Sequence, residues 1–340
     1  MFVVCGEALM DVYTGEATPT GLALDARIGG SPLNVAQGLA RLGRPAAFLA
    51  GLSTDAFGER LLASLAAEGV DTSLVVRSDA PSTLSVVSVD ARGVPRYAFH
   101  GTGAADRQLT HDTLPALPPA VRVLQFGSYA LAVEPVGSAL RALATRERER
   151  RLIAYDPNVR LNVEPDVTHW RALVEQMASI AHLVKVSDED LGLLYPDQTP
   201  ERVAARWLAQ GAVLVAVTRG GHGASAWTRA ARAEVPTPQV KVIDTVGAGD
   251  TFQAALLTWL DEHEALTPEA LAALDGEALG ALLGFAAKAA AITCSRRGMS
   301  ARRAGLSRCV SLVRQRPGTL RSTRWEDEWQ RPAPADCGRP

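Results

Sequence analysis

The chain has 340 residues, of which 47% are hydrophobic and 21% charged, a composition that supports a large buried core. The formal net charge of −2 gives no indication of a nucleic-acid or membrane partner, so we expect neither. The four cysteines (Cys5, Cys294, Cys309 and Cys337) form no C-x-x-C pair and no metal-finger spacing, which favours free thiols in a reducing compartment. The opening MFVVCGEALMDVY lacks a basic leader and no uncharged apolar run approaches a membrane span, so we expect a cytoplasmic protein.

Short β-branched runs alternate with longer helical patterns along most of the chain. Strands are predicted at 2–9, 46–52, 121–127, 151–157, 181–187 and 212–218, and helices at 34–43 and 57–69. Repeated βα units predict an α/β fold with a mostly parallel sheet and helices on both faces. Ligands in such sheets bind beyond the carboxyl ends of the strands.

Two stretches break this alternation. Residues 82–100 (STLSVVSVDARGVPRYAFH) alternate around the turn DARG and predict a hairpin, which the turn-rich residues 12–28 could join. We expect a small β-lid formed from about 12–28 and 82–106. The tail at 307–340 is rich in Arg and Pro and has no sustained period, so we expect it to be poorly ordered and without a catalytic role. The catalytic domain would then span 1–306.

The segment DTVGAGDTF (244–252) lies between the apolar run VKVI (240–243) and an amphipathic run. It predicts a strand that ends at Ile243 and a helix that begins near Thr251. The N–H groups of Ala248, Gly249 and Asp250 could converge on an anion at this partially positive helix terminus, and glycine removes the Cβ that would block a phosphate. The P-loop pattern and the H-R-D and D-F-G motifs of protein kinases are absent.

Asp250 needs a different explanation, because a carboxylate repels phosphate. One interpretation is a general base that accepts the proton of a substrate hydroxyl group. The other is an ordinary helix N-cap. The segment alone leaves both open.

The segment DTVGAGD resembles the second signature of the ribokinase-like (pfkB-type) carbohydrate kinases, D-T-x-G-A-G-D. The stretches GEALMDV (6–12), GGSPLNVAQGLARLG (29–43) and 50–73 are similar to other motifs of that family, in the family's order, and the resemblance extends to about residue 306. It implies a ribokinase-like three-layer α/β/α fold with a central mostly parallel sheet and a small β-lid. It also implies an ATP-dependent sugar kinase, with Asp250 as catalytic base beside the backbone of Gly247, Ala248 and Gly249.

The sugar site implied by the resemblance lies near the amino terminus and under the lid. YAFHGTGAADRQL (97–109) and YDPNVR (155–160) resemble the fructokinase branch, which implies transfer to the C6 hydroxyl group of fructose. The implied sugar-binding residues are Asp11, Gly29, Gly30, Asn34, Tyr97, Phe99, Asn158 and Arg160. The first two glycines would let the backbone approach the sugar. A turn or cap role for Asp11 and Asn34, packing within the lid for Tyr97 and Phe99, and an exposed position for Arg160 are the structural alternatives.

The implied nucleotide site uses the second half of the chain. VKVSDEDL (184–191) occupies the place of the family's N-x-x-E motif but departs from it, with Lys185 and Asp188 at the two defining positions. Asp188 would hold a water of a Mg²⁺ ion, and Lys185 would face phosphate, although a solvated acidic helix start is the alternative. The other implied ATP-binding residues are Thr218, Gly220, Gly221, Gly249 and Ala287. A monovalent cation such as K⁺ would bind near Asp244, Val246, Ser295, Gly298 and Ser300.

Other functions remain as alternatives. Another sugar kinase of the family could act on 2-keto-3-deoxygluconate, ribose or a nucleoside, and a sugar-binding protein could have lost catalysis. A dinucleotide-binding enzyme is excluded because GEALMD replaces G-x-G-x-x-G after the first strand. Lids in this family often pair between subunits, which implies a homodimer through the lid, with a monomer as the alternative.

Overall fold

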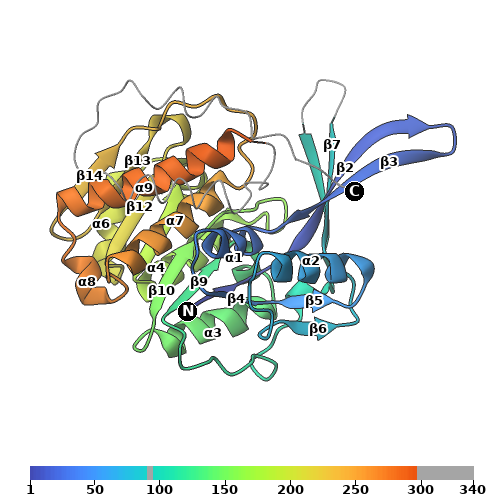
Figure 1. Ribbon diagram of the computed structural model, residues 1–340, viewed down its shortest axis with the longest axis horizontal. Helices are drawn as coiled ribbons and strands as arrows, with labels where there is room; N and C mark the ends of the chain where they lie inside the picture. The colour runs from blue at the N-terminus through green and yellow to red at the C-terminus, as the bar shows by residue number, and fades with distance from the viewer. Residues whose placement is uncertain (90–94, 297–340) are drawn as a thin grey trace, which may run out of the picture.

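A computed structural model describes residues 1–89 and 95–296 of the chain (Figure 1). Its main sheet has eight strands in the order β14-β13-β12-β11-β10-β9-β1-β4. The pairs from β4 to β12 are parallel, whereas β13 and β14 join antiparallel at one edge. These strands are β1 (Phe2–Cys5), β4 (Ala46–Leu49), β9 (Val123–Gly127), β10 (Leu152–Asp156), β11 (Leu183–Ser187), β12 (Leu214–Thr218), β13 (Ala224–Trp227) and β14 (Arg232–Val235).

Helices cover both faces of this sheet, which confirms the predicted three layers. Alternate residues of β1 point to opposite faces, so that Phe2 and Val4 belong to one hydrophobic core while Val3 and Cys5 belong to the other. The first core contains apolar residues of α1 (Ser31–Arg41), α2 (Ala56–Ala67), α7 (Ala248–Glu262), α8 (Pro268–Ala272) and α9 (Gly276–Cys294). The second contains those of α3 (Val136–Glu147), α4 (Val167–Ile180), α5 (Asp188–Leu194) and α6 (Pro200–Gln210).

Among the residues that the structure describes, α9 is the one helix long and apolar enough to cross a membrane. It packs along α7, and its residues Leu279, Leu282 and Leu283 are fully buried in the first core. Its place in the core therefore accounts for its apolar composition.

A second sheet of four strands stands beside the main sheet, in the order β3-β2-β7-β8 (Figure 1). Its strands are β2 (Leu9–Thr18), β3 (Gly21–Gly29), β7 (Leu84–Val89) and β8 (Pro95–His100). The segments 12–28 and 82–100 thus share one sheet, although the turn expected at 90–93 and the tail at 307–340 lie outside the described residues. A third sheet pairs β5 (Gly51–Ser53) with β6 (Val76–Ser78).

Three predicted strands differ from the structure. The strand expected at 2–9 is interrupted at Gly6, whose φ of +151° starts the turn from the main sheet to the lid sheet. The strand expected at 46–52 divides at Ala50 into β4 and β5. The strand expected at 240–243 does not form, because none of the described strands pairs with these residues. The preceding strand β14 ends before Pro236 and Pro238, which lack the N–H groups that would extend its ladder.

His182 lies in the sheet just before β11 and stays neutral there. Its Nδ1 atom accepts a hydrogen bond of 3.0 Å from the backbone N–H of Ile153. Burial lowers its pKa to about 4, and Arg148 acts in the same direction. Because this pKa is below the unfolded value of 6.5, His182 contributes stability that is complete above that value and is lost as the pH falls towards 4.

We therefore expect the free energy of unfolding to fall as the pH is lowered from about 6.5 to about 4. In His182→Asn the part of this fall that comes from His182 should be absent. The asparagine amide oxygen retains an acceptor for Ile153 but takes up no proton. Denaturant unfolding of both proteins across this pH range checks the expectation. Equal slopes would show that His182 does not contribute.

Candidate active site

A cavity of about 920 Å³ lies where the carboxyl ends of the parallel strands meet the lid sheet. Asp156, Ser187 and Thr218, the last residues of β10, β11 and β12, all line it, as expected for an open α/β sheet. The structure brings most of the predicted site residues into this single cavity: Asp11, Gly30, Asn34, Tyr97, Phe99, Asn158, Arg160, Lys185, Asp188, Thr218, Gly220, Gly221, Val246, Gly247, Ala248, Gly249, Asp250 and Ala287. Gly29, Asp244 and Ser295 do not line it.

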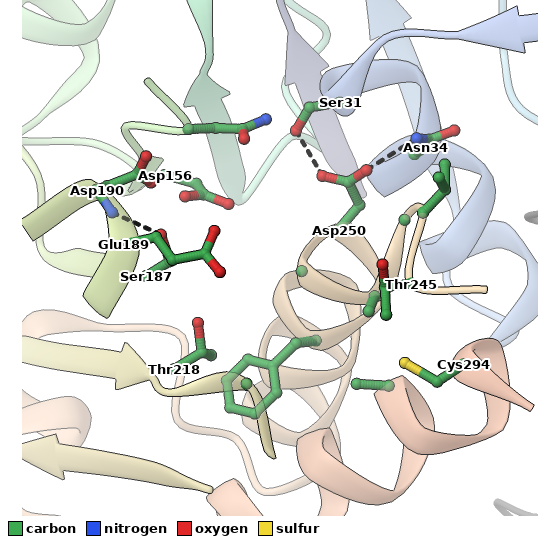
Figure 2. Close-up of a pocket in the computed structure, with 18 of the residues that line it drawn as sticks. Ser31, Asn34, Asp156, Ser187, Glu189, Asp190, Thr218, Thr245, Asp250 and Cys294 are labelled. Carbon is green, nitrogen blue, oxygen red and sulfur yellow. Dashed lines mark hydrogen bonds between the residues drawn. The ribbon is translucent and has the colours of Figure 1, made fainter. Parts of the chain in front are cut away.

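Asp250 projects from the first turn of α7 into the cavity, between two side chains of α1 (Figure 2). The Ser31 hydroxyl donates to its Oδ1 at 2.6 Å, and the Asn34 amide donates to its Oδ2 at 2.8 Å. The predicted start of the helix near Thr251 was wrong, because α7 begins at Ala248 with Gly247 as its N-cap. Asp250 is therefore not an N-cap, and neither is Asn34, which lies inside α1 after the N-cap Gly30.

The backbone before Asp250 forms a tight turn that only glycine adopts readily. Gly247 has a φ of +77°, in the left-handed region. The Ala248 N–H donates to the Thr245 carbonyl at 3.2 Å, so this group, expected to face an anion, is engaged in the turn. The N–H groups of Gly249 and Asp250 lie in the first helical turn, where the helix itself offers no acceptor, and they are the better anion donors.

The electrostatic surroundings of Asp250 suit a base. Burial raises the pKa of its carboxyl group, and the nearby Asp156 carboxylate adds to this effect. The hydrogen bonds from Ser31 and Asn34 and the charge of Lys185 oppose it. The net result is a pKa above the ordinary value, which makes the carboxylate a stronger proton acceptor than an exposed aspartate.

Lys185 and Asp156 form a buried ion pair on the opposite wall. The Lys185 Nζ atom lies 2.8 Å from Asp156 Oδ2, and only 5% and 4% of the two side chains are exposed. Burial lowers the pKa of Lys185, but Asp156, Asp250 and Asp190 together outweigh it and the pKa is raised. A Cβ on Gly249 would lie 3.1 Å from Lys185 Nζ, so the ammonium group lies against the glycine turn.

The start of α5 brings acidic side chains to the same wall (Figure 2). The Ser187 hydroxyl accepts from the Asp190 N–H and caps the helix, which leaves Asp188 half-buried at the cavity. The Asp190 carboxylate accepts from the Val159 N–H at 3.2 Å, and burial raises its pKa to about 6. Asp156 Oδ1 is buried without a hydrogen-bond partner. An unpaired carboxylate oxygen in the cavity that Asp188 also lines fits a hydrated cation, whereas the described residues hold no cluster of three or more His, Cys, Asp or Glu for direct ligation.

The lid end of the cavity contains the predicted sugar-binding residues. Burial raises the pKa of Asp11 on β2, while the Ser85 side chain and Arg160 act against this. Tyr97 and Phe99 of β8 both face the cavity; Tyr97 is 56% exposed, and Phe99 packs edge-on against Tyr129 at 5.9 Å. Phe99 thus lines the cavity and also packs on the turn Tyr129–Leu131 outside the lid sheet, and its contact with a sugar stays a prediction.

The glycine pair before α1 is also required by packing within the protein, and the predicted approach of its backbone to a sugar stays a prediction. A Cβ at Gly29 would lie 2.4 Å from Asp11 Oδ2, and one at Gly30 would lie 2.8 Å from the Glu7 carbonyl oxygen. Packing within the protein requires both glycines, and Gly29 contributes by leaving space for the Asp11 carboxylate.

The far end of the cavity is formed by Thr218, by the glycines that follow it, and by Ala287 of α9. The Cys294 carbonyl at the end of α9 accepts from the N–H groups of Ile243 and Asp244, so the helix holds the loop that leads to Gly247. The Asp244 Oδ1 atom accepts from the Val246 N–H at 3.0 Å. Gly298 and Ser300, expected near a monovalent cation, lie outside the described residues.

Several cavity residues were not predicted from the sequence. Ser31 lies within the quoted stretch GGSPLN and Asp156 within YDPN, but which side chain would contact Asp250 or Lys185 depends on tertiary contacts between segments about 220 and 30 residues apart. Glu7, Ser128 and Asp190 were also missed. Nothing in a single sequence distinguishes these residues from other polar residues near strand ends.

Known proteins resemble this chain along most of its length. It is 39% identical over 279 residues to a protein named fructokinase from Rhizobium leguminosarum bv. trifolii, covering 82% of this chain and 85% of the relative. It is 34% identical to fructokinase-1 of Oryza sativa subsp. japonica, covering 88% and 93%.

Solved structures show the same similarity. The structure of fructokinase with bound ATP from Xylella fastidiosa superimposes with a TM-score of 0.82 at 28% identity, covering 92% of this chain and 98% of that one. Fructokinase from Vibrio cholerae O395 with fructose, ADP and calcium gives 0.73 at 27% identity, covering 90% and 97%. The pfkB family carbohydrate kinase model matches residues 1–303, and the chain therefore belongs to that family, with its ribokinase-like fold.

Proposed function

We propose that this protein is an ATP-dependent fructokinase that transfers the γ-phosphoryl group of ATP to the C6 hydroxyl group of fructose. The observation that carries the proposal is the position of Asp250, a carboxylate fixed by Ser31 and Asn34 at a glycine turn, inside a cavity shared with the lid. The names of the relatives support fructose as the acceptor, and the titles of the Xylella and Vibrio structures support ATP as the phosphoryl donor.

Asp250 accepts the proton of the acceptor hydroxyl group, whose oxygen attacks the γ-phosphorus in line while the bond from that phosphorus to the bridging oxygen of ATP breaks and ADP leaves. The two bonds from α1 hold the carboxylate in one orientation, so it aims the oxygen as well as taking the proton. The N–H groups of Gly249 and Asp250 and the Lys185 ammonium stabilise the charge that develops on the phosphoryl oxygens.

The remaining assignments divide between the two ends of the cavity. Asp11, Asn34, Asn158 and Arg160 bind the sugar beneath Tyr97 and Phe99, and closure of the lid excludes water. Thr218, Gly220, Gly221 and Ala287 contact the nucleotide.

Two cations complete the proposed site. Asp188, through water, and the free oxygen of Asp156 would hold Mg²⁺, which would neutralise phosphate charge. The loop at 244–246 and Ser295 would hold a K⁺ ion, which would steady the turn that presents Asp250.

We further propose a cytoplasmic homodimer that pairs through the lid. The free thiols of Cys5 and Cys294 support a reducing compartment. Leu22, Leu24 and Tyr97 of the lid sheet are 51%, 61% and 56% exposed, which supports an apolar contact between subunits.

A substrate panel tests the proposal. ADP release is measured with fructose, 2-keto-3-deoxygluconate, ribose and a nucleoside, and the product from fructose is identified by mass and by phosphorus NMR. We expect fructose to give the highest kcat/KM and the phosphate to be on C6. If only another sugar is phosphorylated, that sugar replaces fructose as the proposed acceptor. If no sugar leads to ATP consumption, the result favours a sugar-binding protein without catalysis.

A further inference from the structure

Glu7 is a buried carboxyl group in the wall of the cavity, and the reaction described above gives it no role. It follows Gly6 at the carboxyl end of β1, between the main sheet and the lid sheet, and is 1% exposed. Ser128 and Tyr129 line the cavity with it. A glutamate is rarely buried so completely unless its oxygen atoms have partners.

The partners of Glu7 are mostly hydrogen-bond donors. The Ala130 N–H donates to Oε2 at 3.4 Å, and the Ser128 side chain and the Glu7 backbone N–H both favour the ionised form of the carboxyl group. Ser128 has a φ of +61°, a conformation that non-glycine residues seldom adopt. The chain thus adopts an uncommon backbone geometry at the residue whose side chain lowers the pKa of Glu7.

The titratable groups around Glu7 come from three elements. Asp106 belongs to the 3₁₀ turn Ala105–Arg107, Tyr129 to the 3₁₀ turn Tyr129–Leu131, and Arg160 to the loop after β10. The Asp106 carboxylate already accepts from the hydroxyl groups of Thr83 (2.6 Å) and Tyr129 (2.9 Å). Asp106 therefore raises the pKa of Glu7 through its charge and not through a hydrogen bond between the two carboxyl groups.

A count of hydrogen-bonding positions indicates what Glu7 offers. An ionised carboxylate has four acceptor positions, and a protonated carboxyl group exchanges one of them for an O–H donor. The hydrogen bond from Ala130 occupies one position and leaves others for a ligand in the cavity. Burial, with a smaller contribution from Asp106, raises the pKa of Glu7 to about 8 against the opposing effects of Ser128 and Arg160. The protonated carboxyl group therefore offers an O–H donor at one of the positions that remain.

We propose that Glu7 is a specificity-determining residue that donates its carboxyl proton in a hydrogen bond to one hydroxyl oxygen of the bound sugar, other than the oxygen that is phosphorylated. The proposal rests on the proposed sugar kinase function and adds a polar contact on the side of β1. A buried donor that loses its partner is costly, so such a contact discriminates strongly against a sugar that lacks the hydroxyl group.

The first test combines variants of Glu7 with substrates that each lack one hydroxyl group. Glu7→Ala and Glu7→Gln are assayed with fructose, with 1-, 3- and 4-deoxyfructose, and with 2,5-anhydro-D-mannitol, which lacks the anomeric hydroxyl group. For fructose we expect kcat/KM to fall about ten- to a hundredfold in Glu7→Ala, and less in Glu7→Gln, whose amide retains a donor. For one analogue, Glu7→Ala should lower kcat/KM little further, because that analogue already lacks the hydroxyl group that contacts Glu7. Additive losses for all four analogues would overturn the proposal.

The second test distinguishes a binding role from a structural one. In the wild type, kcat/KM for fructose should fall as the pH rises through about 8, because the donated proton is lost; Glu7→Gln should lack this fall while KM for ATP stays unchanged in both. Glu147→Gln is the matched control, a buried glutamate of α3 that binds Arg146 and Arg151 away from the cavity and should keep the wild-type profile. Identical pH profiles for wild type and Glu7→Gln would also overturn the proposal.

The wild-type enzyme shows separately whether the proposed sugar kinase function itself fails. If the wild-type enzyme phosphorylates a different sugar, that sugar is the acceptor, and both tests then use it and its deoxy analogues. A wild-type enzyme that phosphorylates none of them overturns both proposals at once.

Discussion

Asp250→Asn is expected to lower kcat by roughly two to four orders of magnitude. The amide has nearly the same shape as the carboxylate but does not accept the proton of the acceptor hydroxyl group. It also presents an NH₂ group that competes with the donors Ser31 and Asn34 for the same space. Steady-state kinetics with coupled ADP detection measures the loss.

The control for this variant is Asp197→Asn, the same chemical change at an exposed aspartate outside the cavity. It should retain wild-type turnover. Thermal unfolding of Asp250→Asn verifies the fold, and we expect little loss of stability, because a buried carboxyl group with a raised pKa is costly to ionise. Turnover within tenfold of wild type in a folded variant would remove Asp250 from the mechanism.

The architecture was predictable because its signals are local. The apolar runs that became β9 to β12 and the amphipathic pattern of α1 depend on periodicity within about ten residues, and the glycine turn before Asp250 was visible in the sequence. The order of the motifs along the chain also predicted that the sugar end and the nucleotide end of the site lie close together, since strands in a parallel sheet present their carboxyl ends at one edge.

The parts that failed depend on tertiary partners. The apolar residues 240–243 have the composition of a strand, but no neighbouring strand pairs with them, and Val242 and Ile243 are 61% and 51% exposed. The space that Gly29 leaves for the Asp11 carboxylate is visible only once β2 and β3 are paired. Lys185 was expected to face phosphate, and its partner Asp156, 29 residues earlier in the chain, could not be anticipated.

The ion pair between Lys185 and Asp156 leads to the prediction with the largest effect on stability. Lys185→Met is expected to lower the free energy of unfolding by about 3–5 kcal/mol, because it leaves a buried carboxylate without a counter-charge. Asp156 already has one oxygen without a partner, so the remaining carboxylate has little compensation. Chemical denaturation at neutral pH measures the change.

The double variant Lys185→Met/Asp156→Asn separates stability from catalysis. Removing both charges should restore most of the lost stability, because the penalty arises from the unpaired charge and not from the loss of the pair itself. Turnover should stay low by roughly two orders of magnitude, because the ammonium group against Gly249 is one of the groups that stabilise the phosphoryl charge. If the double variant were as unstable as Lys185→Met, the charge would not be the cause of the instability. If it regained wild-type kcat, Lys185 would serve only to neutralise Asp156, and the phosphoryl group would depend on the N–H groups of Gly249 and Asp250.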